Sequence, residues 1–340
     1  MPRPPVPGLN ATSSRLALRL GVTRVARVTG LDRTGVEVAA AIRPDGHVLQ
    51  VTNGKALDYP AAVASALGEA AELWASEQLP LVSAFGSAEE ARALTGFEVL
   101  GGGPARRSWV LGARLDGAPV LVGADEVSCP PLERAPPGLQ VARWTSNGLG
   151  AHPLRAHALA HAALEVWERE ALCRTLPGGW TPPAVSRRRR SFGGPLARTL
   201  ERGGYQLAVF DLTPPGGAAP VAGALLAEAD GPVPLTAGYA ARPTWRAAAL
   251  AAVLEAAQSR LTEIHGARED VLLGRRREAQ SARPLFELPA REGTPRAMTA
   301  TALLRAWRRT AVVVELAPGR LPLSVLKLVV PGARVSELLT

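Results

Sequence analysis

The chain of 340 residues carries a formal net charge of +9, and 47% of its residues are hydrophobic. A chain of this length and composition can bury one large core or two ordinary ones. No stretch of about 18 or more apolar residues is free of charges and helix breakers, so the sequence predicts no membrane-spanning helix.

Residues 1–20 are rich in proline where an export signal needs an apolar run. We therefore expect a flexible lead-in over these residues and a cytoplasmic protein. The two cysteines, Cys129 and Cys173, have no metal-ligand spacing, which agrees with a reducing compartment.

The positive charge comes almost entirely from arginine, since Lys55 and Lys327 are the only lysines. A compositional preference for arginine explains much of this charge. The densest basic run, 187–190, lies between Pro-rich and Gly-rich stretches and is typical of a solvated loop. This argues against a nucleic-acid partner, which needs a basic face with groove-reading elements. A groove for an acidic peptide or for nucleotide phosphates is an equally good use of the charge.

The first half of the chain mixes strand and helix patterns. Short β-like runs are predicted at 23–28, 36–42, 48–52, 109–115 and 119–122. Pro60 opens a helix that runs to about Glu77, because proline is tolerated in the first helical turn. The pair Asp116-Gly117 between the last two runs predicts a β-hairpin.

The second half continues this mixture. Helices are predicted at 154–172 and 244–264, and strands at 206–212, 221–228, 311–316 and 323–330. Residues 176–195, rich in Pro, Gly and Arg, are expected to form an exposed loop. Strands and helices mixed throughout predict an α/β (α+β mixed) fold and exclude a helical bundle. We expect one catalytic domain over 21–335 and a short tail over 336–340.

The helix that starts at Pro60 carries a polar stripe. Ser65, Glu69 and Glu72 are spaced i, i+4 and i+7, which places them on one side of the helix. Val63 and Leu67 belong to a separate apolar stripe that can face a core.

The helix predicted at 154–172 repeats this arrangement. His157, His161, Glu165 and Glu168 share one stripe, with small and apolar residues on the other side. His157 is either a further metal ligand, which would favour a transition metal, or a helix-face residue. We favour the helix-face interpretation for both histidines.

Two helices that each offer a pair of glutamates can hold four carboxylates around hard cations. Mg²⁺ prefers oxygen ligands and is commonly completed by waters and substrate phosphates. A single Glu-x-x-Glu is more often a solvated helix face, but two such helices with apolar surroundings favour a metal site. A ferritin-like di-iron centre is excluded because it needs Glu-x-x-His pairs in a bundle. No P-loop motif is present either.

The order of several short motifs resembles the YcaO family. The motifs are TGLDR at 29–33, GK at 54–55, SALGEAAE at 65–72, SNGL at 146–149, LEVWERE at 164–170, EAAQSRLT at 255–262, GARED at 266–270 and VVPG at 329–332. Each is weak alone, but together they follow the family order over about 22–333.

The resemblance implies a YcaO-type ATP-binding fold of mixed sheets flanked by long helices, unlike a P-loop or kinase fold. It implies that Glu69, Glu72, Glu165 and Glu168 ligate Mg²⁺ ions that bridge the ATP phosphates. It also implies that Arg169, Gln258 and Arg260 surround the nucleotide. Lys55 and Ser65 are further candidates for nucleotide contact; each could equally be an ordinary turn or helix residue.

The chemistry implied by the resemblance begins when a nucleophile adds to a backbone amide carbonyl. The oxyanion then takes the γ-phosphoryl group of ATP, and phosphate leaves with that oxygen. The start of the chain, GVTRVA at 21–26, is most similar to family members that work with a TfuA partner and form thioamides. We therefore expect thioamidation of a ribosomal peptide or protein with a TfuA-like partner, and a possible homodimer.

Other outcomes stay open. Azoline formation or amidine formation would use the same activation, although the chain ends without the Pro-x-Pro-x-Pro tail of many azoline-forming members. The sequence also departs from the family at Leu73, Pro153, His157 and Glu255, where Arg, Asn, Glu and Gln are common. These departures keep open a scaffold that binds peptide or partner without ATP turnover, but the four glutamates argue against it.

Overall fold

The structure of the protein is a computed structural model that describes residues 8–139, 144–177, 179–181, 185–188, 195–228, 233–266, 282–292 and 300–335. The α-helices are α1 (Ala11–Leu20), α2 (Tyr59–Ser76), α3 (Ala88–Thr95), α4 (Ala124–Val127), α5 (Arg155–Thr175), α6 (Pro195–Arg202), α7 (Trp245–Ile264) and α9 (Ala300–Ala306). Two short 3₁₀ turns are η1 (Thr29–Leu31) and η2 (Leu132–Arg134).

The strands of the described residues form three sheets. The strands are β1 (Arg24–Arg27), β2 (Glu37–Ile42), β3 (Val51–Ala56), β4 (Val82–Gly86), β5 (Glu98–Val99), β6 (Arg107–Arg114), β7 (Pro119–Gly123), β8 (Leu149–His152), β9 (Ser186–Arg188), β10 (Gln206–Asp211), β11 (Val221–Ala227), β12 (Leu235–Ala241), β13 (Val312–Glu315) and β14 (Ser324–Val329). One sheet has the order β1-β2-β3, and a second has the order β12-β11-β10-β9. The third has the order β5-β7-β6-β13-β14-β8, with β4 also paired to β6. This mixture confirms the predicted α/β class.

Both faces of the first sheet are buried, and its alternating side chains serve two different cores. Along β2, Ala39 and Ala41 pack in the same cluster as residues of α1 and α2. Val38 and Ala40 point to the other face and pack with α7. Because successive side chains of a strand point to opposite faces, this sheet lies between α2 and α7.

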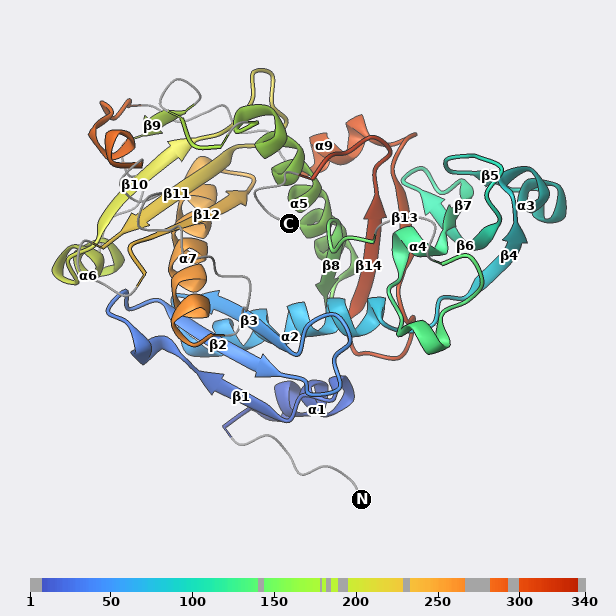
Figure 1. The fold of residues 1–340 in the computed structure, drawn as a ribbon, viewed down its shortest axis with the longest axis horizontal. Coiled ribbons are helices and arrows are strands. Elements are labelled where there is room, and N and C mark those ends of the chain that lie inside the picture. The colour runs from blue at the N-terminus through green and yellow to red at the C-terminus, as the bar shows by residue number, and fades with distance from the viewer. Residues whose placement is uncertain are drawn as a thin grey trace.

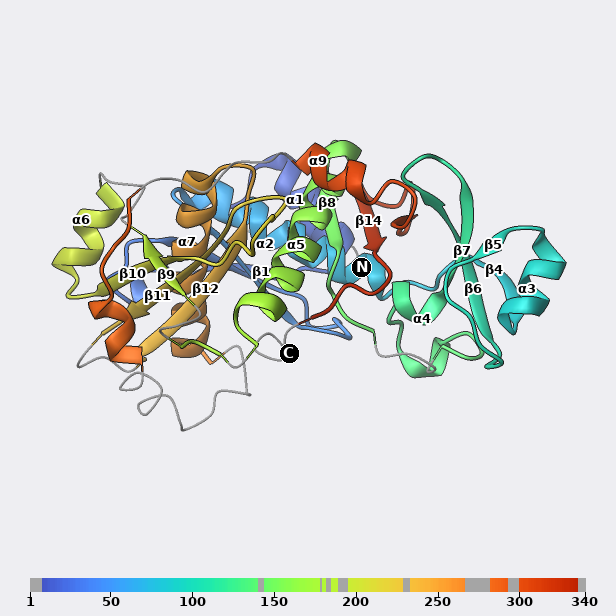
Figure 2. The same ribbon diagram turned by 90° about the horizontal axis from the view of Figure 1, so that it is seen from above.

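Each of the three long helices, α2, α5 and α7, is packed between two sheets (Figures 1 and 2). Helix α2 lies between the first sheet and the third, and α7 between the first and the second. Helix α5 packs against the second and third sheets, through β12 and through β8 and β14. Each long helix therefore separates two of the three sheets.

Two of these helices begin where the sequence predicts, and a side-chain cap marks each start. The Asp58 side chain caps α2 by accepting a hydrogen bond from the Ala61 N–H, and Pro60 lies in the first turn. Thr244 caps α7 in the same way through the Ala247 N–H. Side-chain caps satisfy backbone N–H groups that have no partner inside the helix.

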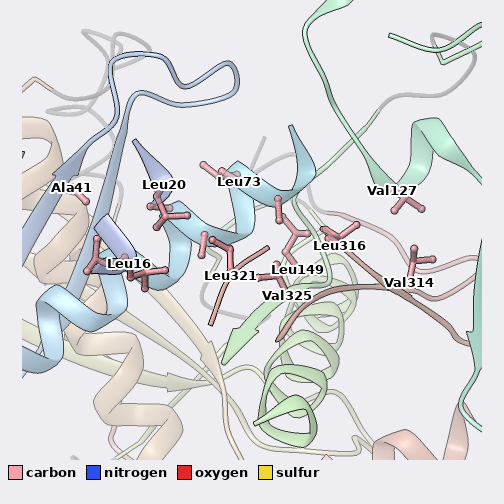
Figure 3. Packing of buried hydrophobic residues seen from close by; sticks show 14 of the residues in the cluster. Leu16, Leu20, Ala41, Leu73, Val127, Leu149, Val314, Leu316, Leu321 and Val325 are labelled. Carbon is pink, nitrogen blue, oxygen red and sulfur yellow. The ribbon is translucent and has the colours of Figure 1, made fainter. Parts of the chain in front are cut away.

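The expected flexible lead-in is partly wrong, because residues 11–20 form α1. The helix is capped by Asn10 and ends at Gly21, which has a positive φ of 75°. Leu16 and Leu20 are buried against α2 and the third sheet, as Figure 3 shows. The prolines of the chain start precede this helix, and its apolar face supplies enough burial to order it.

Two other predictions need correction. Strand β3 covers Val51–Ala56 and not 48–52, because it continues until Asp58 begins α2. Within 176–195, Leu176 and Val185 are buried and β9 pairs with β10, so this segment is not simply an exposed loop. The tail 336–340 lies outside the described residues.

The hairpin predicted at Asp116-Gly117 is confirmed. Strands β6 and β7 pair antiparallel around it, with Ala113 opposite Pro119. With β4, β5 and α3 this hairpin extends away from the three long helices (Figure 2). None of the described helices has the length and apolar content needed to cross a bilayer.

Candidate active site

The structure brings together all four glutamates that the sequence singles out. Glu69 and Glu72 extend from α2, and Glu165 and Glu168 from α5. Glu72 interacts electrostatically with both Glu69 and Glu165, which joins the two pairs into one cluster.

Backbone N–H groups of neighbouring strands hold two of these carboxylates in place. Glu72 Oε1 accepts a hydrogen bond of 2.9 Å from the Ala151 N–H of β8. Glu168 Oε2 accepts one of 3.0 Å from the Ala241 N–H of β12. Each carboxylate is therefore oriented by the strand that precedes a different long helix: β8 precedes α5, and β12 precedes α7.

A fifth carboxylate, Glu255 of α7, joins the cluster, although the sequence prediction left it out. Its Oε2 lies 3.0 Å from Lys55 Nζ of β3. The signal was present in the sequence, because Glu255 opens the motif EAAQSRLT. The family commonly has glutamine at this position, so the resemblance alone predicts no carboxylate there.

Burial shifts the pKa values of the clustered carboxylates. Burial raises the pKa of Glu69 to about 7, with Lys55 opposing and Glu255 adding to the rise. Burial likewise raises the pKa of Glu165 to about 7, against the attraction of Arg169. A carboxylate in a low-dielectric site beside like charges favours its neutral form.

The other three carboxylates divide according to their partners. Burial, followed by repulsion from Glu165 and Glu69, raises the pKa of Glu72 well above its ordinary value. Burial also raises the pKa of Glu168. Burial acts in the same direction on Glu255, but Lys55 and Arg169 outweigh it and hold its pKa below the ordinary value.

Both lysines of the chain lie at this cluster. Lys55 pairs with Glu255, and Lys327 of β14 is buried with Glu165 and Glu72 among its electrostatic neighbours. Lys327 Nζ donates a hydrogen bond to the Thr145 carbonyl oxygen and lies 5.4 Å from the centre of the Trp144 ring. Burial lowers the pKa of Lys327 to about 8.

The donor set fits a hard divalent cation. Glu69, Glu72, Glu165 and Glu168 bring together carboxylate oxygens, the ligands that Mg²⁺ prefers. Within the described residues, no group of three His, Cys, Asp or Glu side chains is arranged to hold a metal ion. Mg²⁺ commonly keeps waters and is completed by phosphate oxygens.

All five predicted nucleotide residues lie on elements that carry the cluster. Arg169 Nη2 lies 3.7 Å from Glu165 Oε1. Ser65 is exposed on α2, one turn before Glu69. Gln258, one turn after Glu255, has a buried Oε1 without a hydrogen-bond donor. Lys55 of β3 joins them through its ion pair with Glu255.

Arg260 has different neighbours. It is buried, forms ion pairs with Asp32 and Glu228, and lies 5.1 Å from the centre of the Tyr205 ring. Its Nε–H has no hydrogen-bond acceptor. Within the described residues its ion pairs are thus with Asp32 of the TGLDR motif and with Glu228 after β11, and not with the glutamate cluster.

The histidines lie at the start of α5. His157 and His161 are both exposed, and the His157 ring lies 4.7 Å from that of His152. Desolvation by the surrounding side chains, followed by repulsion from Arg242 and Lys55, lowers the pKa of His161 to about 4. A neutral imidazole beside two cations contributes no charge to the carboxylate cluster.

Comparison with known proteins identifies the family. The model of a family described as YcaO cyclodehydratase, ATP- and Mg²⁺-binding, matches residues 53–334. The chain belongs to the YcaO family. As a YcaO protein it is an ATP-binding enzyme of the cyclodehydratase type, and its cofactors are ATP and Mg²⁺.

Two curated relatives of this YcaO protein are themselves described only as uncharacterized. One, from Methanothermobacter thermautotrophicus, is 32% identical over 284 residues, which cover 78% of this chain and 71% of the relative. The other, from Rhizobium leguminosarum bv. trifolii, is named for its place in the tfuA 3′ region. It is 29% identical over 358 residues, covering 93% of this chain and 84% of the relative.

Solved YcaO structures share the fold. YcaO from Methanopyrus kandleri, bound with AMPPCP and Mg²⁺, has a TM-score of 0.69 at 24% identity and covers 94% of this chain and 88% of that one. A chain of the E. coli microcin synthetase McbBCD complex has a TM-score of 0.65 at 15% identity, covering 90% and 87%. At these identities the likeness shows the fold.

Proposed function

We propose that this YcaO protein uses Mg²⁺ and ATP to activate a backbone amide of a ribosomal peptide or protein, and that the product is a thioamide. The observation that carries the proposal is the cluster of five carboxylates, four with raised pKa values, facing Lys55 and Arg169. Such a cluster is costly to keep unless a divalent cation binds it.

In this proposal Glu69, Glu72, Glu165 and Glu168 hold Mg²⁺. Lys55, Ser65, Arg169 and Gln258 contact the nucleotide. Lys55 and Arg169 are paired with Glu255 and Glu165 over 3.0 and 3.7 Å, so each already points its charge into the cluster.

Arg260 is the least direct of the proposed nucleotide contacts. Its ion pairs fix the guanidinium, with Nε 3.4 Å from Asp32 Oδ2 and Nη2 paired with Glu228. We assign to it a positioning role on α7, the helix that also carries Glu255 and Gln258.

The bound nucleotide supplies the phosphoryl group that turns a poor leaving group, the amide oxygen, into a good one. The residues of the chain position the reactants and neutralise negative charge, as in phosphoryl transfer generally. Partial burial of the cluster lowers the local dielectric constant and strengthens these electrostatic interactions.

External sulfide is the proposed nucleophile, and a TfuA-like protein the proposed partner. The support is the relative from the tfuA 3′ region, which aligns with 93% of this chain. A side-chain nucleophile, giving an azoline, or a backbone amine, giving an amidine, would use the same residues. The free Cys129 and Cys173 agree with action in the cytoplasm, where ATP is available.

Calorimetric titration of the wild-type protein with ATP, with and without Mg²⁺, tests the site. We expect saturable binding that requires Mg²⁺ and weakens at least about tenfold, or about 1.4 kcal/mol, in Glu69→Gln and in Glu165→Gln. Glu89→Gln is the matched control, because Glu89 is exposed on α3. Binding that survives both cluster variants, or that falls equally in the control, would refute this site.

The nucleophile is tested with the peptide substrate, sulfide and the TfuA-like partner. Thioamidation exchanges oxygen for sulfur and increases the peptide mass, whereas azoline formation loses water and decreases it. Loss of water without added sulfide would replace the thioamide proposal with the azoline one. A wild-type protein that binds peptide but shows no nucleotide binding, even with its partner present, would favour the scaffold.

A further inference from the structure

A second recess lies at the far end of α2, on residues that the proposed chemistry does not use. It is a cavity of about 310 Å³ between the end of α1, the β2–β3 turn, the end of α2 and η2. Each of these four elements contributes polar side chains to its lining.

A buried ion pair forms one wall of this cavity. Arg43 Nη2 lies 2.6 Å from Glu77 Oε1, and both side chains are buried. The same Glu77 oxygen accepts hydrogen bonds from the His47 and Val48 N–H groups, at 3.0 and 2.9 Å. Three donors on one oxygen fully compensate the charge of Glu77, so it does not repel an anion as a free carboxylate would.

Arg43 is not equally satisfied. Its side chain is only 2% exposed, and its Nε–H has no hydrogen-bond acceptor. A buried N–H without a partner is costly, and a guanidinium presents Nε–H and Nη–H as a fork that fits a carboxylate. The wall of the cavity therefore holds a buried donor without a partner.

The rim adds two arginines, one acidic side chain, Asp45, and an apolar surface. Arg19 and Arg134 line the cavity from α1 and η2, and within the described residues the Arg134 side chain has no ion-pair partner. Trp74 lines it from α2, with the Arg320 guanidinium 4.8 Å from its ring centre. An anion attached to a short apolar stem matches this lining better than a free ion does.

Helix α2 links this cavity to the carboxylate cluster. Glu77 follows Glu72 by five residues on the same helix, which is about 8 Å along its axis. Trp74 and Glu77 leave α2 on a different side from Glu72, so the cavity and the cluster are separate sites on one helix.

From these observations we infer that the cavity is a second binding site, which takes the carboxylate of an acidic residue in the peptide substrate. The inference rests on the proposed function for the identity of the ligand as a peptide. It assigns the positive charge of Arg19 and Arg134, and the unpaired N–H of Arg43, to substrate recognition outside the reaction centre.

The test is a calorimetric titration of the intact protein, without nucleotide, with acetyl-Ala-Glu-Ala-amide. The corresponding glutamine tripeptide is the neutral control, and inorganic phosphate is the free-anion control. We expect the glutamate tripeptide to bind at least about tenfold more tightly than either control. In Arg134→Glu we expect this binding to weaken by at least about tenfold.

Arg92→Glu is the matched control variant. Arg92 is exposed on α3, so this variant changes the net charge equally at a place far from the cavity along the fold. Equal weakening in both variants would reduce the effect to net charge and overturn the inference. Equal binding of the glutamine tripeptide, tighter binding of phosphate, or no binding of the glutamate tripeptide would also overturn it.

The same titration in Glu69→Gln separates the inference from the proposed function. We expect this variant to lose nucleotide binding and to keep tripeptide binding. If the wild-type protein binds the tripeptide but no nucleotide, the proposed function fails while the carboxylate site stands. If it binds nucleotide but no tripeptide, the second site fails alone.

Discussion

At the scale of single residues, two requirements conflict in the carboxylate cluster. Ligation of Mg²⁺ needs ionised glutamates, but burial favours their neutral form, with pKa values of about 7 at Glu69 and Glu165. The metal-free protein therefore carries a stability cost at neutral pH that bound cation and nucleotide would remove.

We predict that Glu69→Gln stabilises the metal-free protein above pH 7. The folded pKa of Glu69 lies above its unfolded value, so the folded state binds more protons between about pH 4.5 and 7, and stability falls as pH rises through that window. Removing the ionisable group should raise the free energy of unfolding at pH 8 by about 1–3 kcal/mol. The measurement is urea unfolding at pH 4 and pH 8.

At pH 4 the two proteins should be nearly equally stable, because Glu69 is protonated in both folded and unfolded states. Saturating Mg²⁺ and ATP should reverse the order at pH 8, since only the wild type binds them tightly. A variant that is less stable than the wild type at pH 8 without metal would contradict the raised pKa.

The positions of the two lysines also have a physical reason. In a chain whose other basic residues are arginines, both Lys55 and Lys327 lie at the cluster. An ammonium is a compact charge that shifts its pKa readily when buried, whereas guanidinium stays protonated and needs planar partners. This difference explains why arginine does not replace them there.

At the scale of elements, the site is built from three strand-to-helix units. Strand β3 leads into α2, β8 into α5 and β12 into α7. In each unit a glycine lets the strand approach the helix backbone. A Cβ at Gly54, Gly150 or Gly238 would lie 2.1, 2.3 or 2.2 Å from a helix carbonyl oxygen.

The first two units share one spacing. The number of residues from Gly54 to Glu69 equals that from Gly150 to Glu165, and Glu72 and Glu168 follow at the same interval. Because the spacing from the closest strand–helix contact is equal, both glutamate pairs lie at the same distance along their helix axes from that contact. This is the physical reason why two distant segments present matching carboxylates.

We predict that Gly54→Ala destabilises the protein and weakens nucleotide binding. The new methyl group would overlap backbone atoms of Ala62 and Ala66, so β3 must shift and carry Lys55 with it. The expected loss in the free energy of unfolding is about 1–3 kcal/mol.

Gly68→Ala, in α2, is the control. A Cβ added at Gly68 would meet no neighbouring atom within 4 Å. Its expected effect is a gain of about 0.5–1 kcal/mol, since alanine favours helix over glycine. Urea unfolding and ATP calorimetry measure both variants. Unchanged stability and ATP affinity in Gly54→Ala would show that the strand–helix contact is looser than the structure indicates.

At the scale of the whole molecule, the helices and sheets alternate around the site. Cluster residues come from β3, α2, α5, α7 and β14, so segments from both ends of the chain are needed. Helix α1 packs its Leu16 and Leu20 into the same core that holds α2 and β14 (Figure 3). Order at the start of the chain is therefore coupled to order at the site.

We predict a single thermal unfolding transition that responds to changes at both places. Leu20→Ala, at a side chain only 2% exposed, should lower the free energy of unfolding by about 2–4 kcal/mol. Mg²⁺ and ATP should shift the same transition upward. Differential scanning calorimetry measures both effects.

Leu94→Ala serves as the comparison, since Leu94 is 71% exposed and should change stability little. Two separate transitions, with Leu20→Ala moving one and nucleotide the other, would show that the chain does not form one cooperative unit.

The sequence by itself determined the features that depend on local spacing. Glutamates at i and i+3 share a helix face whatever the helix packs against, so Glu69, Glu72, Glu165 and Glu168 could be chosen before the fold was known. Pro60 near the start of α2 and Thr244 at the start of α7 mark helix starts through their own backbone chemistry.

Only the tertiary structure decided which of these faces meet. Glu255 and Lys327 join the cluster because α7 and β14 pack beside α2 and α5, and no spacing along the chain encodes that contact. The same holds for the pairing of Arg260 with Asp32 and for the burial of α1, whose amphipathic face needs a partner surface to become ordered. Periodicity within an element is a local property, whereas the neighbours of that element follow from the burial of apolar surface across the whole chain.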